Sequence, residues 1–385
     1  MSQASFLLQR QNGIVSLFLT YFRNYKRLRL TLDTRSVLLT GPNGAGKTNV
    51  LEAISLLSSG KGLRQAPLSE IRTITAPALS NWSVSVQVQT PSGVLDLGTG
   101  LEEPSSRHAI ERRIARIHHQ CAKSLSAFDD FLWILWLTPS MDRLFTEAPQ
   151  KRRQFFDHLV TGLFPKHKGF CAQYKILLKE RMKLLMTRNS DITWISAIEK
   201  RLAHIGAKIT AARNDFLKLL MGALPDTPSP FPFPEIHLLE TYTPEGSIEE
   251  TLCAVLEESR DQDAQTGNTA FGPHRTEWNV LFVEKGLPAS ACSTGEQKAL
   301  LISIVLATAR LYKERRQGVP LLLFDDLSAH IDALKQSALW QVLKNLEMQT
   351  WFTGVMPPHF PTTDADLQCF AVEHGICIPS SFHPS

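Results

Sequence analysis

The sequence predicts an α/β fold: a mixed sheet with an antiparallel meander, joined to an inserted helical lobe that carries a short antiparallel helical hairpin. Three observations predict it. A short apolar run at 35–40 leads through a glycine-rich loop into residues 49–57, which have helical spacing. Residues 82–118 contain alternating apolar and polar side chains, as strands of a half-buried antiparallel sheet do. Residues 195–219 repeat apolar side chains at spacings of three and four, the heptad seam of a helix that packs against another.

The glycine-rich loop fits the pattern G-x-x-x-x-G-K-[ST] at every position. It consists of Gly41, Pro42, Asn43, Gly44, Ala45, Gly46, Lys47 and Thr48. Glycines let such a loop wrap closely, so that successive N–H groups and the positive end of the next helix face phosphate oxygens. Lys47 is then placed to reach the β- and γ-phosphates, and the Thr48 hydroxyl to ligate Mg²⁺. A glycine-rich turn before a helix is the alternative, but the strand and helix on either side favour an ATP site.

Composition sets broad limits on the kind of protein. The chain has 385 residues, 43% hydrophobic and 20% charged, which is typical of globular domains and long enough for two or three of them. A net charge of +4 permits an anionic partner without requiring one. The six cysteines are scattered, so we expect reduced thiols. No segment is apolar and long enough to cross a membrane and no secretory signal is apparent, so we expect a cytoplasmic protein without a membrane partner.

The first part of the chain reads as strands. After a loose tail at 1–12, residues up to 22 and residues 25–32 alternate as two strands. Between them, 21–27 mixes aromatic and basic side chains. It is either a turn with solvated charges or a surface that meets adenine or nucleic-acid phosphate. Three strands of the meander follow, and 131–138 is a buried strand.

A helical region runs from about residue 149 to residue 224. Tyr174, Leu177 and Leu184 give its middle helix an apolar stripe, and 187–191 suits the tip of a hairpin. Its faces carry many basic residues, which we expect to be exposed: Lys151, Arg152, Arg153, Lys166, Lys168, Lys175, Lys179, Arg181, Lys183 and Arg188. A solvated face and a patch that binds the phosphate backbone of nucleic acid are equally good interpretations.

The second half of the predicted site begins after a proline-rich connector at 225–234. Residues 293–297 open a long helix, and Ser293, Gly295 and Gln297 are candidates to offer N–H groups and a hydroxyl to an anion. By itself this pattern is also that of an ordinary helix N-terminus.

The strand at 320–324 ends in two carboxylates. An acid at a strand end beside a phosphate loop is where Mg²⁺ is held, and we assign that role to Asp325. Asp326 would then position or deprotonate the attacking water. Lys47, Asp325 and Asp326 are therefore the candidate catalytic residues. A strand followed by a polar turn is the alternative.

The order of loop, helix start and acid-ended strand is that of the ATP-binding-cassette ATPases, and the chain resembles the RecF family. The residues that carry the likeness lie at 22–25 (FRNY), 41–52 (GPNGAGKTNVLE), 149–157 (PQKRRQFFD), 272–275 (GPHR), 293–300 (STGEQKAL) and 322–326 (LLFDD). They span nearly the whole chain. We therefore divide it into a first part of a P-loop cassette ATPase lobe at 13–140, a helical lobe at 141–230 and a second part of the ATPase lobe at 231–385.

The resemblance implies an activity and partners. RecF-like proteins form ATP-dependent homodimers, bind single-stranded and gapped duplex DNA, and act with RecO and RecR to help place RecA. In such dimers Ser293 and Gly295 of one subunit would contact the γ-phosphate of ATP held by residues 44–48 of the other. Gln297 belongs to the same signature. ATP and Mg²⁺ are the implied cofactors.

Some positions depart from the family pattern. Thr276 and Glu277 follow Arg275 where acids are usual, which leaves its role open between phosphate contact and a structural turn. His330 stands where an acid is usual. The final core strand at 349–354 carries no histidine to sense the γ-phosphate, and Thr353 is the candidate substitute. We therefore expect a weak, DNA-stimulated ATPase.

Three other classes of protein fit part of the pattern. A transporter ATPase would not place so large a helical region between loop and signature. A chromosome-organising ATPase needs a far longer coiled coil than 169–224 supplies. An ATP-gated DNA-binding module that does not hydrolyse ATP remains compatible with the sequence.

Overall fold

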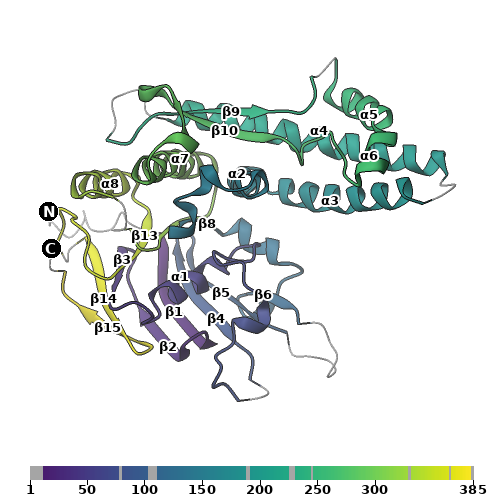
Figure 1. Cartoon of the computed structure of the whole chain (residues 1–385). Coiled ribbons are helices and arrows are strands. Elements are labelled where there is room, and N and C mark those ends of the chain that lie inside the picture. Colours follow the sequence, from purple (N-terminus) through teal and green to yellow (C-terminus); the bar gives the residue numbers. More distant parts are fainter. Residues whose placement is uncertain are drawn as a thin grey trace. The chain divides into compact units, whose positions relative to one another are not determined.

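The structure, a computed structural model, describes residues 12–77, 80–102, 111–187, 191–224, 230–243, 246–327, 331–363 and 366–382. Its contacts divide the chain into two compact units (Figure 1). Unit 1 comprises Met1–Asp142 and Arg316–Ser385, and unit 2 comprises Arg143–Arg315. The stretch 231–315, which we assigned to the ATPase lobe, thus belongs to the same compact unit as the helical region. No helix among the described residues has the length and apolarity that a membrane span needs.

A six-stranded mixed sheet forms the centre of unit 1. Its order is β15 (Ile376–Ser380), β14 (Leu367–Glu373), β3 (Ser36–Thr40), β13 (Gln349–Gly354), β12 (Val319–Phe324) and β8 (Leu132–Leu137). All neighbours are parallel except β14 and β15. Strands β8, β12 and β13 are buried along their whole length. This burial explains the unbroken apolar sequences of β8 and β12. Because β3 and β12 run parallel, the loop after β3 and the acids after β12 lie at the same edge of the sheet.

An antiparallel sheet forms the second layer of unit 1, as the meander predicted. Its order is β2 (Tyr25–Thr31), β1 (Gly13–Phe22), β4 (Ser83–Thr90), β5 (Gly93–Leu101), β6 (Arg113–Ile117) and β7 (Gln120–Cys121). One face is apolar and joins helix α1 (Lys47–Ser55) and the mixed sheet in a single core. The alternation of buried and accessible residues leaves the other face accessible to solvent. Helix α8 (Ala333–Leu346) completes the unit.

Unit 2 is largely helical. It contains α2 (Pro149–Leu163), α3 (Lys166–Leu185), α4 (Ile192–Ala223), α5 (Ile248–Glu258), α6 (Arg260–Thr266) and α7 (Thr294–Arg315). A small sheet joins β9 (Pro234–Leu239), β10 (Glu277–Phe282) and β11 (Leu287–Pro288). The predicted hairpin is confirmed: α3 and α4 pack through a cluster of buried apolar side chains, namely Tyr174, Leu177, Ile198, Leu202, Ile205 and Ile209.

The basic residues of unit 2 do not all form an exposed face. The expectation was wrong for Arg181, whose side chain is completely buried among α3, α4, α5 and α6. Arg152 pairs with Glu277, and Arg153 donates to the Thr276 carbonyl at 3.1 Å. Arg275 donates its Nε proton to the Thr269 carbonyl at 3.1 Å, which favours the structural turn for this residue. Arg188 lies outside the described residues.

A second polar cluster of unit 2 is structural in character. Arg213 donates from Nε and Nη2 to the two oxygens of Asp157 at 2.8 and 2.9 Å, and His167 Nε2 lies 2.8 Å from the same carboxylate. Burial alone would raise the pKa of Asp157, but Arg213 and His167 outweigh it and hold that pKa at about 2. Cys171 Sγ lies 3.5 Å from His167, and burial raises the pKa of this thiol to about 12. With both carboxylate oxygens bound by arginine and the thiol protonated, the cluster does not suit a metal ion.

Candidate nucleotide site

The predicted loop follows β3 directly, and its last two residues, Lys47 and Thr48, begin α1. Two of its glycines are required by close contacts. Gly41 has φ +147°, and a Cβ there would meet the Val372 carbonyl oxygen of β14 at 2.2 Å. Gly46 has φ +117°, and a Cβ there would meet Asn24 Nδ2 at 2.5 Å and Tyr25 OH at 2.7 Å. These contacts explain why the loop needs glycine at both positions.

Residues 23–25, at the turn from β1 into β2, hold this loop through hydrogen bonds. Asn24 donates from Nδ2 to the Ala45 carbonyl at 2.9 Å, and the Tyr25 hydroxyl donates to the Gly46 carbonyl at 3.1 Å. Arg23 donates from Nε to Glu52 of α1 at 2.8 Å, and Glu52 is almost fully buried. The predictions for 21–27 are a turn with solvated charges or a surface that meets adenine or nucleic-acid phosphate. The structure instead shows that Arg23, Asn24 and Tyr25 brace the loop and its helix.

The loop presents its backbone donors to the space above it. Within the described part of the chain, the N–H groups of Gly44, Gly46 and Thr48 have no acceptor. Asn43 and Gly44 are exposed, whereas Ala45 and Gly46 are buried against the bracing turn. Donors left open at the start of a helix attract phosphate oxygens, so the backbone is arranged for the predicted ligand.

Lys47 adds a positive charge to these donors. Its ammonium donates to the carbonyls of Gly41 at 2.7 Å and Pro42 at 2.9 Å. Burial lowers the pKa of Lys47, while the carboxylates of Asp326 and Asp325 act in the opposite direction. Carbonyl acceptors are weaker partners for an ammonium than phosphate oxygens are, so an incoming triphosphate can displace them.

The acid-ended strand meets the loop through Asp325. The Thr48 hydroxyl donates to Asp325 Oδ1 at 2.8 Å, across 277 positions of sequence. A threonine hydroxyl beside a carboxylate is a donor set of hard oxygens, which suits Mg²⁺. Asp326 follows with φ +50°, a conformation that costs an aspartate little.

Thr353, at the end of β13, connects the two acids. Its hydroxyl donates to Asp325 Oδ1 at 2.7 Å and accepts the backbone N–H of Asp326 at 2.8 Å. We had predicted that this residue senses the γ-phosphate. Both bonds of its hydroxyl are made within the protein, so its visible role is to orient the carboxylates.

Substituting Thr353 with valine should raise the Mg²⁺ concentration needed for half-maximal ATP binding about tenfold. Valine is close to threonine in shape but lacks the hydroxyl that orients Asp325. A hydrogen bond to a charged group is worth about 1.5–3 kcal/mol. The measurement is a Mg²⁺ titration of fluorescent nucleotide binding. Thr353→Ser keeps the hydroxyl and serves as the control. Equal Mg²⁺ dependence in both variants would contradict the orienting role.

The predicted signature residues all lie in unit 2, and the structure separates their roles. Ser293 is exposed and Gly295 is half-buried at the first turn of α7. Ser293 and Glu296 cap the helix reciprocally. The Ser293 N–H donates to Glu296 Oε2 at 2.9 Å, and the Glu296 N–H donates to Ser293 Oγ at 3.4 Å. Gln297 is buried and donates to the Cys292 carbonyl at 2.9 Å, so its amide supports the helix start. His330 lies outside the described residues.

Comparisons with known proteins identify the family of the chain. A family model described as an AAA domain matches residues 16–87, which include the loop and α1. The chain is 38% identical over 369 residues to the DNA replication and repair protein RecF of Rhizobium rhizogenes, covering 94% of this chain and 97% of the relative. It is 38% identical over 379 residues to the protein of the same name from Mesorhizobium japonicum, covering 96% and 98%.

Solved structures show the same fold. The structure described as the recombination mediator protein RecF–ATP in the RecFOR pathway has a TM-score of 0.80 at 23% identity, covering 97% of this chain and 98% of that chain. An Smc head domain from Pyrococcus furiosus has a TM-score of 0.53 at 14% identity, covering 96% of both chains. The identity to curated relatives over more than nine tenths of both chains shows that this protein belongs to the family of DNA replication and repair proteins named RecF.

Proposed function

We propose that this chain is an ATP-dependent DNA-binding protein of recombinational gap repair and replication restart, which dimerises on DNA when ATP is bound. The observation that carries the proposal is the meeting of Thr48 and Asp325 beside a braced glycine loop, since this is the geometry an ATP–Mg²⁺ site needs. Family membership supports DNA as the target, and it supports RecO, RecR and, indirectly, RecA as partners.

The residues of one chain supply one half of the proposed site. The backbone of 41–48 and Lys47 bind the triphosphate, while Thr48 and Asp325 would hold Mg²⁺, which neutralises phosphate charge when bound. Asp326 positions the attacking water or accepts its proton. Ser293 and Gly295 of a second subunit contact the γ-phosphate, so ATP joins the two subunits.

Slow hydrolysis is part of this proposal. β13, the described strand beside Asp325, contains no histidine. The side chain of Asp326 is one methylene shorter than that of a glutamate, so its carboxylate reaches less far. A weak catalytic site keeps ATP intact long enough for the dimer to remain on DNA. Hydrolysis then limits how long the dimer stays on DNA and does not drive movement along it.

The decisive experiment measures self-association and binding to gapped duplex and single-stranded DNA, with and without Mg·ATP. ATP should strengthen both at least tenfold in the wild type. Lys47→Arg keeps the charge but not the shape of the ammonium, so the variant should need a much higher ATP concentration for the same response. DNA affinity should also fall steeply with salt, because phosphate contacts release counterions. If ATP changes neither property in the wild type, the proposed switch is wrong.

A further inference from the structure

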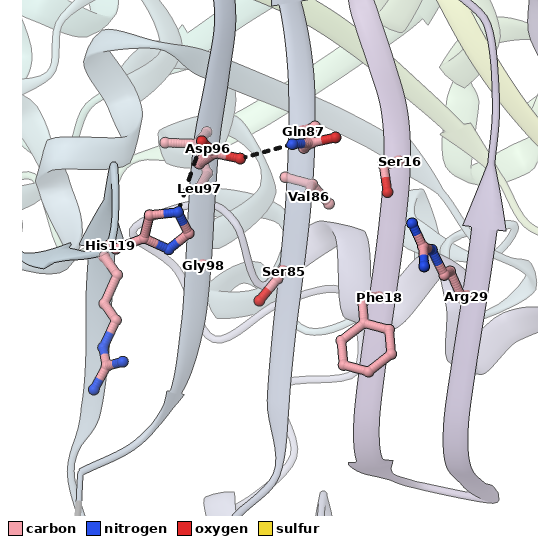
Figure 2. A pocket seen from close by; sticks show the side chains of 11 residues that line it. Ser16, Phe18, Arg29, Ser85, Val86, Gln87, Asp96, Leu97, Gly98 and His119 are labelled. Atoms are coloured by element: carbon pink, nitrogen blue, oxygen red, sulfur yellow. Dashed lines mark hydrogen bonds and ion pairs between the residues drawn. The ribbon is translucent and has the colours of Figure 1, made fainter.

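The outer face of the antiparallel sheet in unit 1 is accessible to solvent and hollowed. A shallow cavity of about 420 Å³ lies on it, lined from β1, β2, β4, β5 and β6 and the turn after β6. Figure 2 shows several of these side chains standing on the strands, with Phe18 and Arg29 on adjacent strands. None of the residues assigned to the nucleotide site lines this cavity.

Strand register places five of the lining residues in one row across the sheet. Arg29 of β2 is opposite Phe18 of β1, and Phe18 is opposite Ser85 of β4. Ser85 is opposite Gly98 of β5, and Gly98 is opposite Arg116 of β6. With strands about 4.8 Å apart, the row spans about 19 Å from one arginine to the other. It therefore has an aromatic side chain near one end, small residues beside it and a cation at each end.

The side chains of this row have the chemistry of a stacking platform. Phe18 is 38% exposed although it is a large apolar residue in the middle of a sheet. Arg29 and Arg116 are exposed, and neither guanidinium forms a hydrogen bond or ion pair with any other described residue. Unpaired arginines beside an exposed aromatic ring are the groups that proteins use to hold phosphates and to stack unpaired bases.

Asp96, the acidic residue that lines the cavity, is already hydrogen-bonded within the protein. Asp96 accepts a hydrogen bond from Gln87 Nε2 at 3.1 Å, and its carboxylate lies 3.9 Å from His119 Nε2 (Figure 2). The same carboxylate lies 3.9 Å from His118 Nδ1. A hydrogen-bonded carboxylate presents fewer free lone pairs to the cavity than an unbonded one does. Ser16, Ser85 and Gln87 add neutral hydrogen-bonding groups suited to base edges or sugars.

We propose that this row, Arg29–Phe18–Ser85–Gly98–Arg116, is a binding surface for single-stranded DNA, with a base stacked on Phe18 and phosphates held by the two arginines. A single strand is favoured over a duplex because a stacked base must be unpaired. It is favoured over a protein because three of the eleven lining residues are arginine or histidine and the carboxylate is paired. The surface goes beyond the proposed function, which names DNA but no contact site, and it does not depend on the ATP switch.

The test measures binding of a labelled oligothymidylate of about 20 nucleotides to the full chain without nucleotide, by fluorescence anisotropy. Phe18→Ala should weaken binding about tenfold, since stacking of one base is worth about 1–3 kcal/mol. Arg29→Gln combined with Arg116→Gln should lower the slope of log affinity against log salt by about 1.4.

Gly98→Val tests the cavity without removing any group. A Cβ at Gly98 meets nothing nearer than the Val84 carbonyl oxygen at 3.5 Å, and valine is favoured in strands. The variant should fold normally, fill the floor of the row and weaken oligothymidylate binding as Phe18→Ala does.

Matched controls come from elsewhere in unit 1. Ile378→Ala removes an apolar side chain of β15 that is 55% exposed, and Lys344→Gln removes an exposed cation of α8. Both should bind the oligonucleotide as the wild type does, and all variants should keep their ATP-dependent self-association. The proposal is overturned if Phe18→Ala and Gly98→Val bind oligothymidylate like the controls. It is equally overturned if they lose only binding to RecR, because the face would then be a protein interface.

Discussion

Replacing Gly46 with alanine should lower the affinity for ATP at least a hundredfold. Alanine at φ +117° is strained in the backbone, and its Cβ would lie 2.5 Å from Asn24 Nδ2 and 2.7 Å from Tyr25 OH. Neither side chain can move without losing its hydrogen bond to the loop, at Ala45 or Gly46. The loop must therefore shift, which misaligns the N–H groups that face the phosphates. A hundredfold loss corresponds to about 2.7 kcal/mol.

Isothermal titration with a slowly hydrolysed ATP analogue measures this effect. Gly169→Ala is the matched control, because a Cβ at this exposed position of α3 meets nothing within 4 Å. That variant should bind ATP normally and be slightly more stable, as alanine favours a helix over glycine by up to about 1 kcal/mol. Unchanged ATP affinity in Gly46→Ala would show that the bracing turn yields freely, contrary to the packing described above.

The predictable part of the site is the part with a local signal. A glycine-rich loop between a strand and a helix is readable in consecutive residues, and so is an apolar strand that ends in acids. Thr48 and Asp325 were both assigned to Mg²⁺ from these two local patterns, and the structure joins their side chains by a 2.8 Å hydrogen bond.

The contacts that the sequence does not reveal are those between residues far apart in the chain. Nothing in 21–27 indicates that Asn24 and Tyr25 reach residues 45 and 46. Thr353 is the candidate substitute for a histidine that senses the γ-phosphate, and only the structure reveals that its hydroxyl is bound to Asp325 and Asp326. In the sequence, the outer face of the meander is visible only as alternation of apolar and polar residues. The alignment of Arg29 with Arg116 depends on the register between strands, which no single strand encodes.

Arg181 is the misjudged residue with the largest energetic consequence. Its helix carries several lysines, so charge pattern alone places it on a solvated face. In the structure its guanidinium donates to Glu199 at 2.9 Å, Asp263 at 2.7 Å, Thr269 at 3.1 Å and the Leu256 carbonyl at 2.7 Å. The group thus connects four helices of unit 2, and it satisfies two carboxylates that are at most 2% exposed.

Arg181→Ala should destabilise unit 2 by about 3–5 kcal/mol, because it leaves Asp263 buried with no cation beside it. The free energy of unfolding is measured by denaturant titration, with hydrogen exchange in α3, α4, α5 and α6 as the readout for unit 2. Arg260→Ala is the control, since Arg260 also binds Glu199 but is partly exposed and leaves Arg181 in place. It should cost about 1 kcal/mol.

A combined variant separates the cost of an unpaired charge from the value of the ion pairs. Arg181→Met with Glu199→Gln and Asp263→Asn removes the buried charges together, so no carboxylate is left uncompensated. Replacing a complete buried network is often neutral, whereas breaking one member is costly. This variant should therefore recover most of the stability that Arg181→Ala loses. If it is as unstable as Arg181→Ala, the stability of unit 2 depends on the geometry of the guanidinium bonds themselves, and desolvation of the carboxylates is not the dominant cost.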